Sequence, residues 1–135
     1  MFSLYRKDVH TAAAAAFLVK AAEPLALSAL NEYELCNALR FAEFRGLLPP
    51  GEAVRRLRAF AEDRATGRWH YSAIALDEIV AQAGVISELH TVKRGHRAFD
   101  ILHVAHAKLA RPKVFLSFDV NQVLLAKLVG LPVRP

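Results

Sequence analysis

The segment RAFDILHVAHAKLARPKVFLSFD, residues 97–119, contains the pattern that decides the fold of this 135-residue chain. Its first part spaces apolar residues for a helix from about Arg97 to Ala110. β-Branched and aromatic residues then predict a short buried strand, VFLSF, at 114–118. Asp100 lies inside the helix and Asp119 directly follows the strand. Carboxylates on apolar segments are costly unless they are paired, placed at a helix end or bound to a cation, so both need an explanation.

Short apolar strands alternate with helices along the rest of the chain. The predicted elements are a helix from about Asp8 to Ala22, a strand at 25–30 that turns directly into a helix at 31–46, a helix at 52–67, a strand at 68–76, a helix at 77–90, a basic loop at 91–96, a short helix at 120–130 and a last strand at 131–133. This alternation is typical of a parallel sheet covered by helices on both faces. We therefore expect one α/β domain over residues 1–135, with functional groups at the carboxyl ends of its strands.

The composition suits a globular domain in a reducing compartment. Hydrophobic residues make up 54% of the chain, which argues against global disorder. The single cysteine, Cys36, excludes an internal disulfide and is expected to be a small buried hydrophobe. No segment approaches the roughly 20 apolar residues of a membrane span, so we expect a cytoplasmic protein with no membrane partner. The net charge of +5 favours an anionic partner such as nucleic acid.

Three acids, Glu34, Asp100 and Asp119, lie where a parallel sheet would gather functional groups. Glu34 is placed in the first turn of the helix after the 25–30 strand, and Asp119 ends the VFLSF strand. Three carboxylates brought together would require a hard cation, and oxygen-only sites suit Mg²⁺ or Mn²⁺. Such ions can activate water for phosphodiester cleavage, while a basic surface holds the nucleic-acid backbone.

Each acid also has an explanation that involves no chemistry. Asn31 and Glu34 have nearly the spacing of a capping box, and Asp119 and Gln122 have the same form, with Asp119 as the N-cap. Asp100 lies in the first turn of its helix, where the helix dipole favours a negative charge. The spacing alone leaves both interpretations open.

The histidines are expected to be packed or solvated rather than to bind a metal. His103 and His106 lie three residues apart, but a transition-metal site needs at least one more firm ligand, and Cys36 has no partner motif. The chain also has no Gly-rich phosphate loop, nucleophile elbow or CxxC motif.

Three segments, taken in order, resemble the PIN domain, and closely its VapC-like toxin branch. They are LSALNEYELCNALR at 27–40, GHRAFDILHVAHA at 95–107 and VFLSFDVNQVLLAKLVGL at 114–131, and the resemblance covers residues 3–132. It implies a PIN-like three-layer α/β/α sandwich with a mainly parallel, short-stranded sheet.

The same resemblance implies a metal-dependent endoribonuclease, the toxin of a VapBC-like toxin–antitoxin system. Carried over by position, Glu34, Asp100 and Asp119 would bind Mg²⁺ (or Mn²⁺) and hydrolyse RNA phosphodiester bonds. Ser117 matches the hydroxyl residue that precedes the last acid and would orient it. The resemblance also implies a homodimer that a VapB-like antitoxin holds inactive.

Three basic side chains lie at or just before the start of the helix that bears Asp100. They are Arg94, His96 and Arg97. We expect them to contact the phosphate backbone of the RNA substrate.

The chain departs from the family's pattern at its N-terminus. The family begins with a strand that ends in an aspartate, whereas SLYRKDVHTAAAAAFL, residues 3–18, matches the family's segment after that strand. A rival alignment makes residues 1–7 the strand and Asp8 the acid. Otherwise Asp8 caps the next helix, and the domain lacks its first central strand and one metal ligand, which would weaken hydrolysis. A start codon assigned too late, a truncated chain and a degenerate domain are the open explanations.

Two other functions stay open. The absent aspartate favours a catalytically inactive PIN-like binding module that docks an antitoxin or RNA. A plain α/β domain whose acids only cap helices would bind no Mg²⁺. RNA cleavage that requires both Mg²⁺ and Asp100 would distinguish the nuclease from these two.

Overall fold

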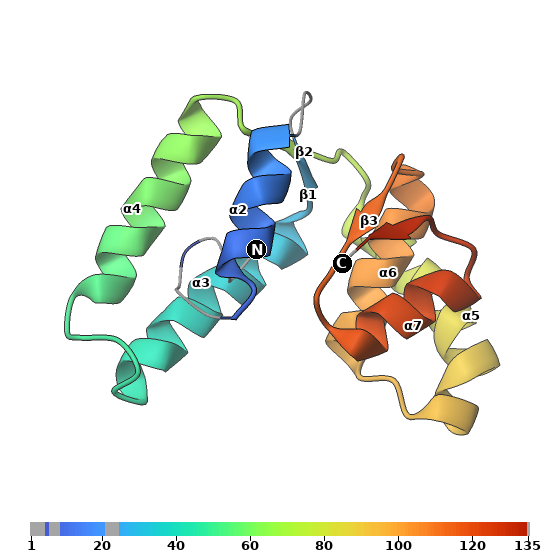
Figure 1. Cartoon of the computed structure of the whole chain (residues 1–135). Helices are drawn as coiled ribbons and strands as arrows, with labels where there is room; N and C mark the ends of the chain where they lie inside the picture. Colours follow the sequence, from blue (N-terminus) through green and yellow to red (C-terminus); the bar gives the residue numbers. More distant parts are fainter. Residues whose placement is uncertain (1–4, 6–8, 21–24, 135) are drawn as a thin grey trace. The chain divides into compact units, whose positions relative to one another are not determined.

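The structure, a computed structural model, describes residues 5, 9–20 and 25–134. It is a mostly helical α/β protein with short parallel strands, and it divides into two compact units, Met1–Tyr71 and Ser72–Pro135 (Figure 1). The elements, in chain order, are α2 (Thr11–Lys20), β1 (Leu25–Leu27), α3 (Ala29–Phe44), α4 (Glu52–Ala65), β2 (Trp69–Tyr71), α5 (Leu76–Arg94), α6 (Ala98–Ala110), β3 (Phe115–Leu116), α7 (Val120–Leu128) and β4 (Val133–Arg134).

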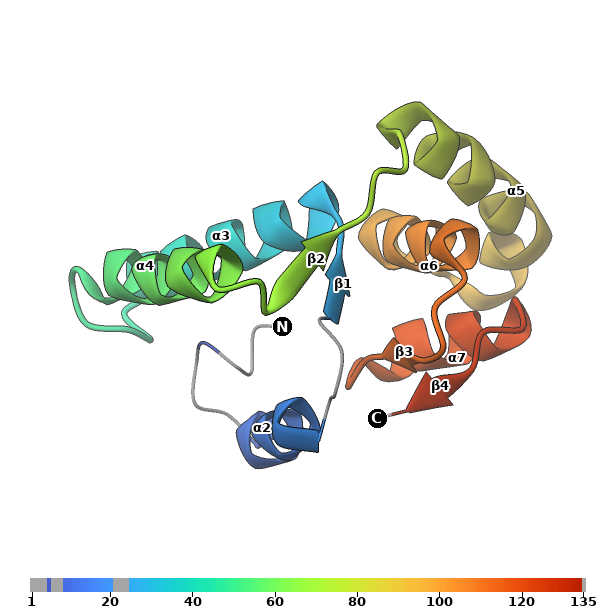
Figure 2. The same ribbon diagram turned by 90° about the horizontal axis from the view of Figure 1, so that it is seen from above.

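The first unit is built around the parallel strands β1 and β2, in which Leu25 pairs with Trp69 and Leu27 with Tyr71. Helices α3 and α4 lie side by side and pack against each other (Figures 1 and 2). Apolar side chains from these elements and from the α3–α4 connection form one core together with Tyr5: Tyr5, Leu27, Leu35, Leu39, Ala42, Leu48, Ala53, Phe60 and Trp69.

Tyr5 joins this core through both its ring and its hydroxyl group. The ring meets Phe60 edge-on, with centroids 5.5 Å apart. The hydroxyl donates to Asp63 Oδ2 at 2.7 Å and accepts from Trp69 Nε1 at 3.0 Å. Burial, reinforced by the hydrogen bond to Asp63, raises the pKa of Tyr5 above its ordinary value, so the phenol stays neutral.

Helix α3 begins at a capping box formed by Ser28 and Asn31, not by Asn31 and Glu34 as the spacing suggested. The Asn31 N–H donates to Ser28 Oγ at 3.3 Å, and the Ser28 N–H donates to Asn31 Oδ1 at 3.0 Å. The acid in the first turn is Glu32, and Glu34 lies beyond that turn. The helix-cap explanation of Glu34 is therefore wrong.

Replacing Ser28 with alanine should destabilise the first unit. The change removes the side-chain oxygen that satisfies the Asn31 N–H, and the loss of such an N-cap costs about 1 kcal/mol. Urea denaturation followed by circular dichroism measures this free energy of unfolding. Ser28→Thr retains a capping hydroxyl and serves as the matched control, so equal stability of Ser28→Ala and wild type would contradict the role of the cap.

In the second unit, β3 and β4 pair in parallel, with Phe115 opposite Val133, and α6 packs against both α5 and α7 (Figure 2). Helix α5 extends further than expected, because residues 91–94 of the predicted basic loop continue it. Gly95, in the left-handed region with φ of 66°, ends the helix. Arg94 therefore lies in the last helical turn rather than in a loop.

The α/β class and the parallel pairing of the strands are confirmed. In the described ranges the strands form two separate two-stranded sheets, so the single sheet of a three-layer sandwich stays a prediction. Asp8, the end of the predicted helix at Ala22 and, apart from Tyr5, the proposed strand at 1–7 lie outside the described residues. Among the residues that the structure does describe, no helix has both the length and the apolar character needed to cross a bilayer.

Candidate metal site

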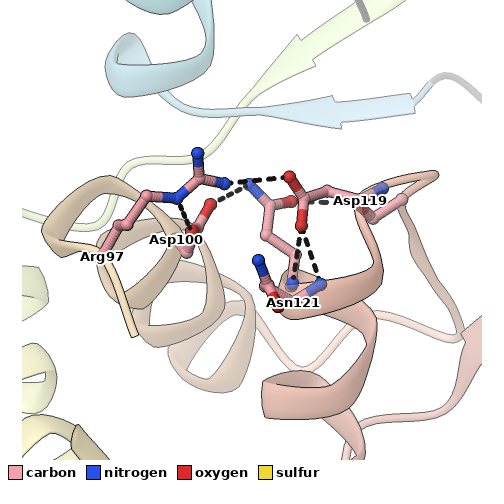
Figure 3. Close-up of polar contacts among 6 residues, drawn as sticks. Arg97, Asp100, Asp119 and Asn121 are labelled. Carbon is pink, nitrogen blue, oxygen red and sulfur yellow. Dashed lines mark hydrogen bonds and ion pairs between the residues drawn. The ribbon is translucent and has the colours of Figure 1, made fainter. Parts of the chain in front are cut away.

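Asp100 and Asp119 come together in the second unit, where they share one arginine. Asp100 lies in the first turn of α6, and Asp119 is the N-cap of α7, shortly after β3. Arg97 Nε donates to Asp100 Oδ2 at 2.8 Å, and Arg97 Nη2 donates to Asp119 Oδ2 at 3.0 Å (Figure 3). Two acids from separate segments of the chain are thus linked through a single guanidinium group.

Further hydrogen bonds fix the other oxygen of each carboxylate. Asp100 Oδ1 accepts from Gln122 Nε2 at 3.1 Å. Asp119 Oδ1 accepts from the backbone N–H groups of Asn121 at 2.8 Å and Gln122 at 3.1 Å. Ser117 Oγ donates to Gln122 Oε1 at 2.9 Å and accepts from the Asp119 N–H at 3.1 Å. Ser117 and Gln122 therefore hold the two acids in a fixed arrangement.

The cluster formed by Arg97, Asp100 and Asp119 carries an excess of negative charge. The Asp100 side chain is only 6% exposed, that of Asp119 is 37% exposed and that of Arg97 is 66% exposed. The hydrogen bond to Asp100, together with the charges of Asp100 and Asp119, raises the pKa of Arg97 above its ordinary value. One guanidinium faces two carboxylates, so the cluster retains a net negative charge that favours a further cation.

Helix capping explains part of this arrangement. The prediction that Asp119 caps its helix is confirmed, because its Oδ1 accepts the first free N–H groups of α7. The side chain of Gln122, however, bonds to Asp100 and Ser117, whereas in a full capping box it would return to the Asp119 N–H. Capping accounts for Asp119 Oδ1, but not for Asp119 Oδ2 or for the burial of Asp100.

The remaining predicted site residues are Glu34, Arg94, His96 and Arg97. Glu34 is an exposed residue of α3 in the first unit. Arg94 is exposed in the last turn of α5, and Nε2 of His96 is buried without a hydrogen-bond partner among the described residues. Arg97 bonds to the two aspartates, and its contact with RNA stays a prediction.

The donor set of the cluster fits a hard divalent cation. Proteins usually hold Mg²⁺ through one or two carboxylates, with waters and substrate phosphates completing the shell. Asp100 and Asp119 supply such a pair, and the nearby Ser117 and Gln122 add only oxygen and nitrogen, not sulfur. Within the described ranges no group of three or more His, Cys, Asp or Glu side chains forms a metal site, so the set completed by Glu34 stays a prediction.

A second polar cluster lies in the first unit at the carboxyl end of β2. The Tyr71 hydroxyl donates to Glu32 Oε2, and Arg64 Nη1 donates to Glu32 Oε1 at 3.2 Å. Arg64 also lies over the Tyr71 ring, 5.8 Å from its centroid. The acid that meets the end of strand β2 is thus Glu32, which the sequence spacing did not single out.

Helix α6 also carries two buried histidines, His103 and His106. Nε2 of His106 is buried and has no hydrogen-bond partner in the part of the chain that the structure describes. Burial, and secondarily the charge of His103, lowers the pKa of His106. Both histidines are packed, which is one of the two states expected for them.

Acidification should destabilise the protein through His106. An unfolded histidine binds its proton near pH 6.5, whereas the buried His106 resists protonation, so its contribution to stability is present above about pH 6.5 and is lost as the pH falls. The free energy of unfolding in urea should therefore decrease from about pH 7.5 to about pH 5.5. His106→Leu should flatten this decrease, and His70→Gln, a change at an exposed histidine, should not. An unchanged slope in His106→Leu would contradict the assignment.

No model of a known protein family matches the chain, and a search of curated proteins returns no match. The resemblance to the PIN domain therefore stays a hypothesis.

Proposed function

We propose that the protein is a Mg²⁺- or Mn²⁺-dependent endoribonuclease of the PIN-like, VapC-like type, the toxin of a VapBC-like pair. The observation that carries the proposal is the convergence of Asp100 and Asp119, from two separate segments, on one cationic group. Both acids belong to the motif segments that resemble the family, and both lie at the N-terminal end of a helix. The parallel pairs β1–β2 and β3–β4 support the accompanying fold, a single PIN-like three-layer sandwich.

In this function the two aspartates hold the cation, and Glu34 is the third acid of the family's pattern. When bound, the ion supplies an activated water and stabilises the leaving oxygen of the RNA phosphodiester. Asp100, buried and bonded to Gln122, provides a rigid oxygen, and Ser117 fixes the turn that presents Asp119. Arg94 and His96, shortly before the start of α6, would bind the RNA backbone.

Exposed apolar side chains support the proposal that the chain binds two protein partners, a VapB-like antitoxin and a second copy of the chain. Phe41 and Phe44 on α3 are both exposed, and their rings stack with centroids 6.0 Å apart. Val85, Leu89 and Val92 form a second exposed apolar stripe at helical spacing on α5. Apolar patches of this kind are typical of protein-binding surfaces.

A cleavage assay tests the proposed function. The purified chain is incubated with a mixture of structured and single-stranded RNAs, with Mg²⁺, with Mn²⁺ and with EDTA. We expect cleavage with either ion and none with EDTA, because the chain's carboxylates need the cation to act on a phosphate. Cleavage that is indifferent to EDTA would overturn the assignment.

One observation favours the alternative, a catalytically inactive PIN-like module that docks an antitoxin or RNA. Arg97 already pairs with both carboxylates, so each acid has a cationic partner without a metal. The module would retain RNA in a filter-binding assay and cleave none of it with any divalent cation. Those two results would favour the binding module over the nuclease as the function of the protein.

A further inference from the structure

Arg97 holds the same oxygens that a shared cation would need. It bonds to Oδ2 of Asp100 and Oδ2 of Asp119. The two Oδ1 atoms are engaged elsewhere, by the Gln122 side chain and by backbone N–H groups of α7. An ion that links both carboxylates through the Oδ2 pair would meet like-charge repulsion from the guanidinium, which bonds to both of these oxygens.

The position of Arg97 allows it to leave. Its side chain is 66% exposed and extends from the N-cap residue of α6, so it has solvent on the side away from the acids. The Arg97–Asp119 pair is exposed on both sides, and ion pairs of this kind contribute little to stability, so breaking that bond costs little. Asp100, by contrast, is buried, and its carboxylate needs a replacement cation once the guanidinium has gone.

We propose that Arg97 is a built-in competitor of the metal. Its side chain must swing away from Asp100 and Asp119 before a divalent cation binds between them. This inference rests on the proposed function, because it concerns the regulation of the same site. The guanidinium keeps the two carboxylates together in the metal-free protein and opposes binding of the ion.

The released guanidinium has an obvious acceptor in the substrate. Arginine forms paired hydrogen bonds with phosphate oxygens, and an RNA phosphate at the site would draw Arg97 away from the carboxylates. An RNA phosphate that binds Arg97 would free the carboxylates for the metal, and a metal on the carboxylates would free Arg97 for the phosphate. The phosphate and the metal would therefore favour each other's binding. The site would be loaded efficiently only when RNA and the ion are both present.

The test compares Mn²⁺ affinity in the full chain by calorimetry for wild type, Arg97→Met, Arg97→Lys and Lys93→Met. Arg97→Met keeps the length of the side chain and removes the competing charge, so we expect binding at least about fivefold tighter than in wild type. Arg97→Lys keeps the positive charge but lacks the planar guanidinium that donates to both carboxylates, so its Mn²⁺ affinity should be intermediate. Lys93→Met removes an exposed charge from α5 and should leave the affinity within about twofold of wild type.

A second readout monitors Arg97 directly. In the metal-free protein the Arg97 Nε–H is bonded to Asp100, and its ¹⁵N NMR signal should be protected from exchange with water. Addition of Mg²⁺ should abolish that protection.

The possible outcomes separate the two proposals. Tighter binding by Arg97→Met, with loss of the protected signal in wild type, would support the competitor. Equal or weaker binding by Arg97→Met would overturn it and leave the nuclease assignment standing, because Arg97 would then be organising the acids for the ion. If neither wild type nor Arg97→Met binds Mn²⁺, both the nuclease assignment and the role of Arg97 as a competitor are overturned. If the protected Arg97 signal survives saturation with Mg²⁺, only the role of Arg97 as a competitor is overturned.

Discussion

Replacement of Asp100 by asparagine should reduce Mg²⁺-dependent RNA cleavage by at least about 100-fold. The change removes a negatively charged oxygen from the buried side of the cluster. A catalytic metal lowers the activation free energy by several kcal/mol, and each 1.36 kcal/mol corresponds to a factor of ten in rate. Asparagine has the shape of aspartate and keeps an oxygen that can accept from Gln122. Initial rates on one RNA substrate, with the fold checked by circular dichroism, measure the effect. Cleavage within about threefold of wild type would contradict the role of Asp100.

Two matched variants sharpen this prediction. Asp77→Asn changes an acid in the first turn of α5, outside the cluster, and should retain wild-type activity. Asp119→Asn separates capping from chemistry, because asparagine caps helices about as well as aspartate does but carries no charge. We expect Asp119→Asn to lose cleavage as Asp100→Asn does, with little loss of stability. Full activity in Asp119→Asn would mean that Asp119 only caps α7.

Replacement of Leu39 by alanine should cost about 2–5 kcal/mol of unfolding free energy. Leu39 is completely buried in the core of the first unit, where the lost methyl groups leave a cavity that the surrounding side chains fill only in part. A domain of this size has a total stability of roughly 5–15 kcal/mol, so the variant should lose a large fraction of it. Urea denaturation measures the difference. Leu47→Ala, a change at a side chain that is 59% exposed, is the control, and equal effects of the two changes would contradict the assigned core.

Local patterns predicted the helices well, and the errors lie at helix ends. The helix at 31–46 begins earlier, at Ala29, because Ser28 supplies the capping oxygen. That shift moved Glu34 out of the first turn and removed its capping explanation. The loop expected at 91–96 is mostly helical, because charged residues do not end a helix, whereas Gly95 in the left-handed region does.

The candidate site could be predicted only in part. The spacing of Arg97 and Asp100 already favours an ion pair, since residues three apart are neighbours on a helix face. The second bond of Arg97, to Asp119, depends on the packing of α6 against α7, and no local pattern encodes it. For the same reason the spacing identifies Gln122 only as part of a helix cap, whereas its side chain connects Ser117 with Asp100. Glu34 belongs to the other unit, and its place in the metal set stays a prediction.

Calorimetric titration of Mn²⁺ into wild type and into the double variant Asp100→Asn/Asp119→Asn tests most directly the claim that these two aspartates form a metal site. We predict one saturable binding event in wild type that is absent from the double variant, while both proteins have the same far-ultraviolet circular dichroism. Equal binding heats in the two proteins would place the metal elsewhere. No binding by wild type and none by Arg97→Met would show that the two carboxylates serve only to hold Arg97 and the start of α7.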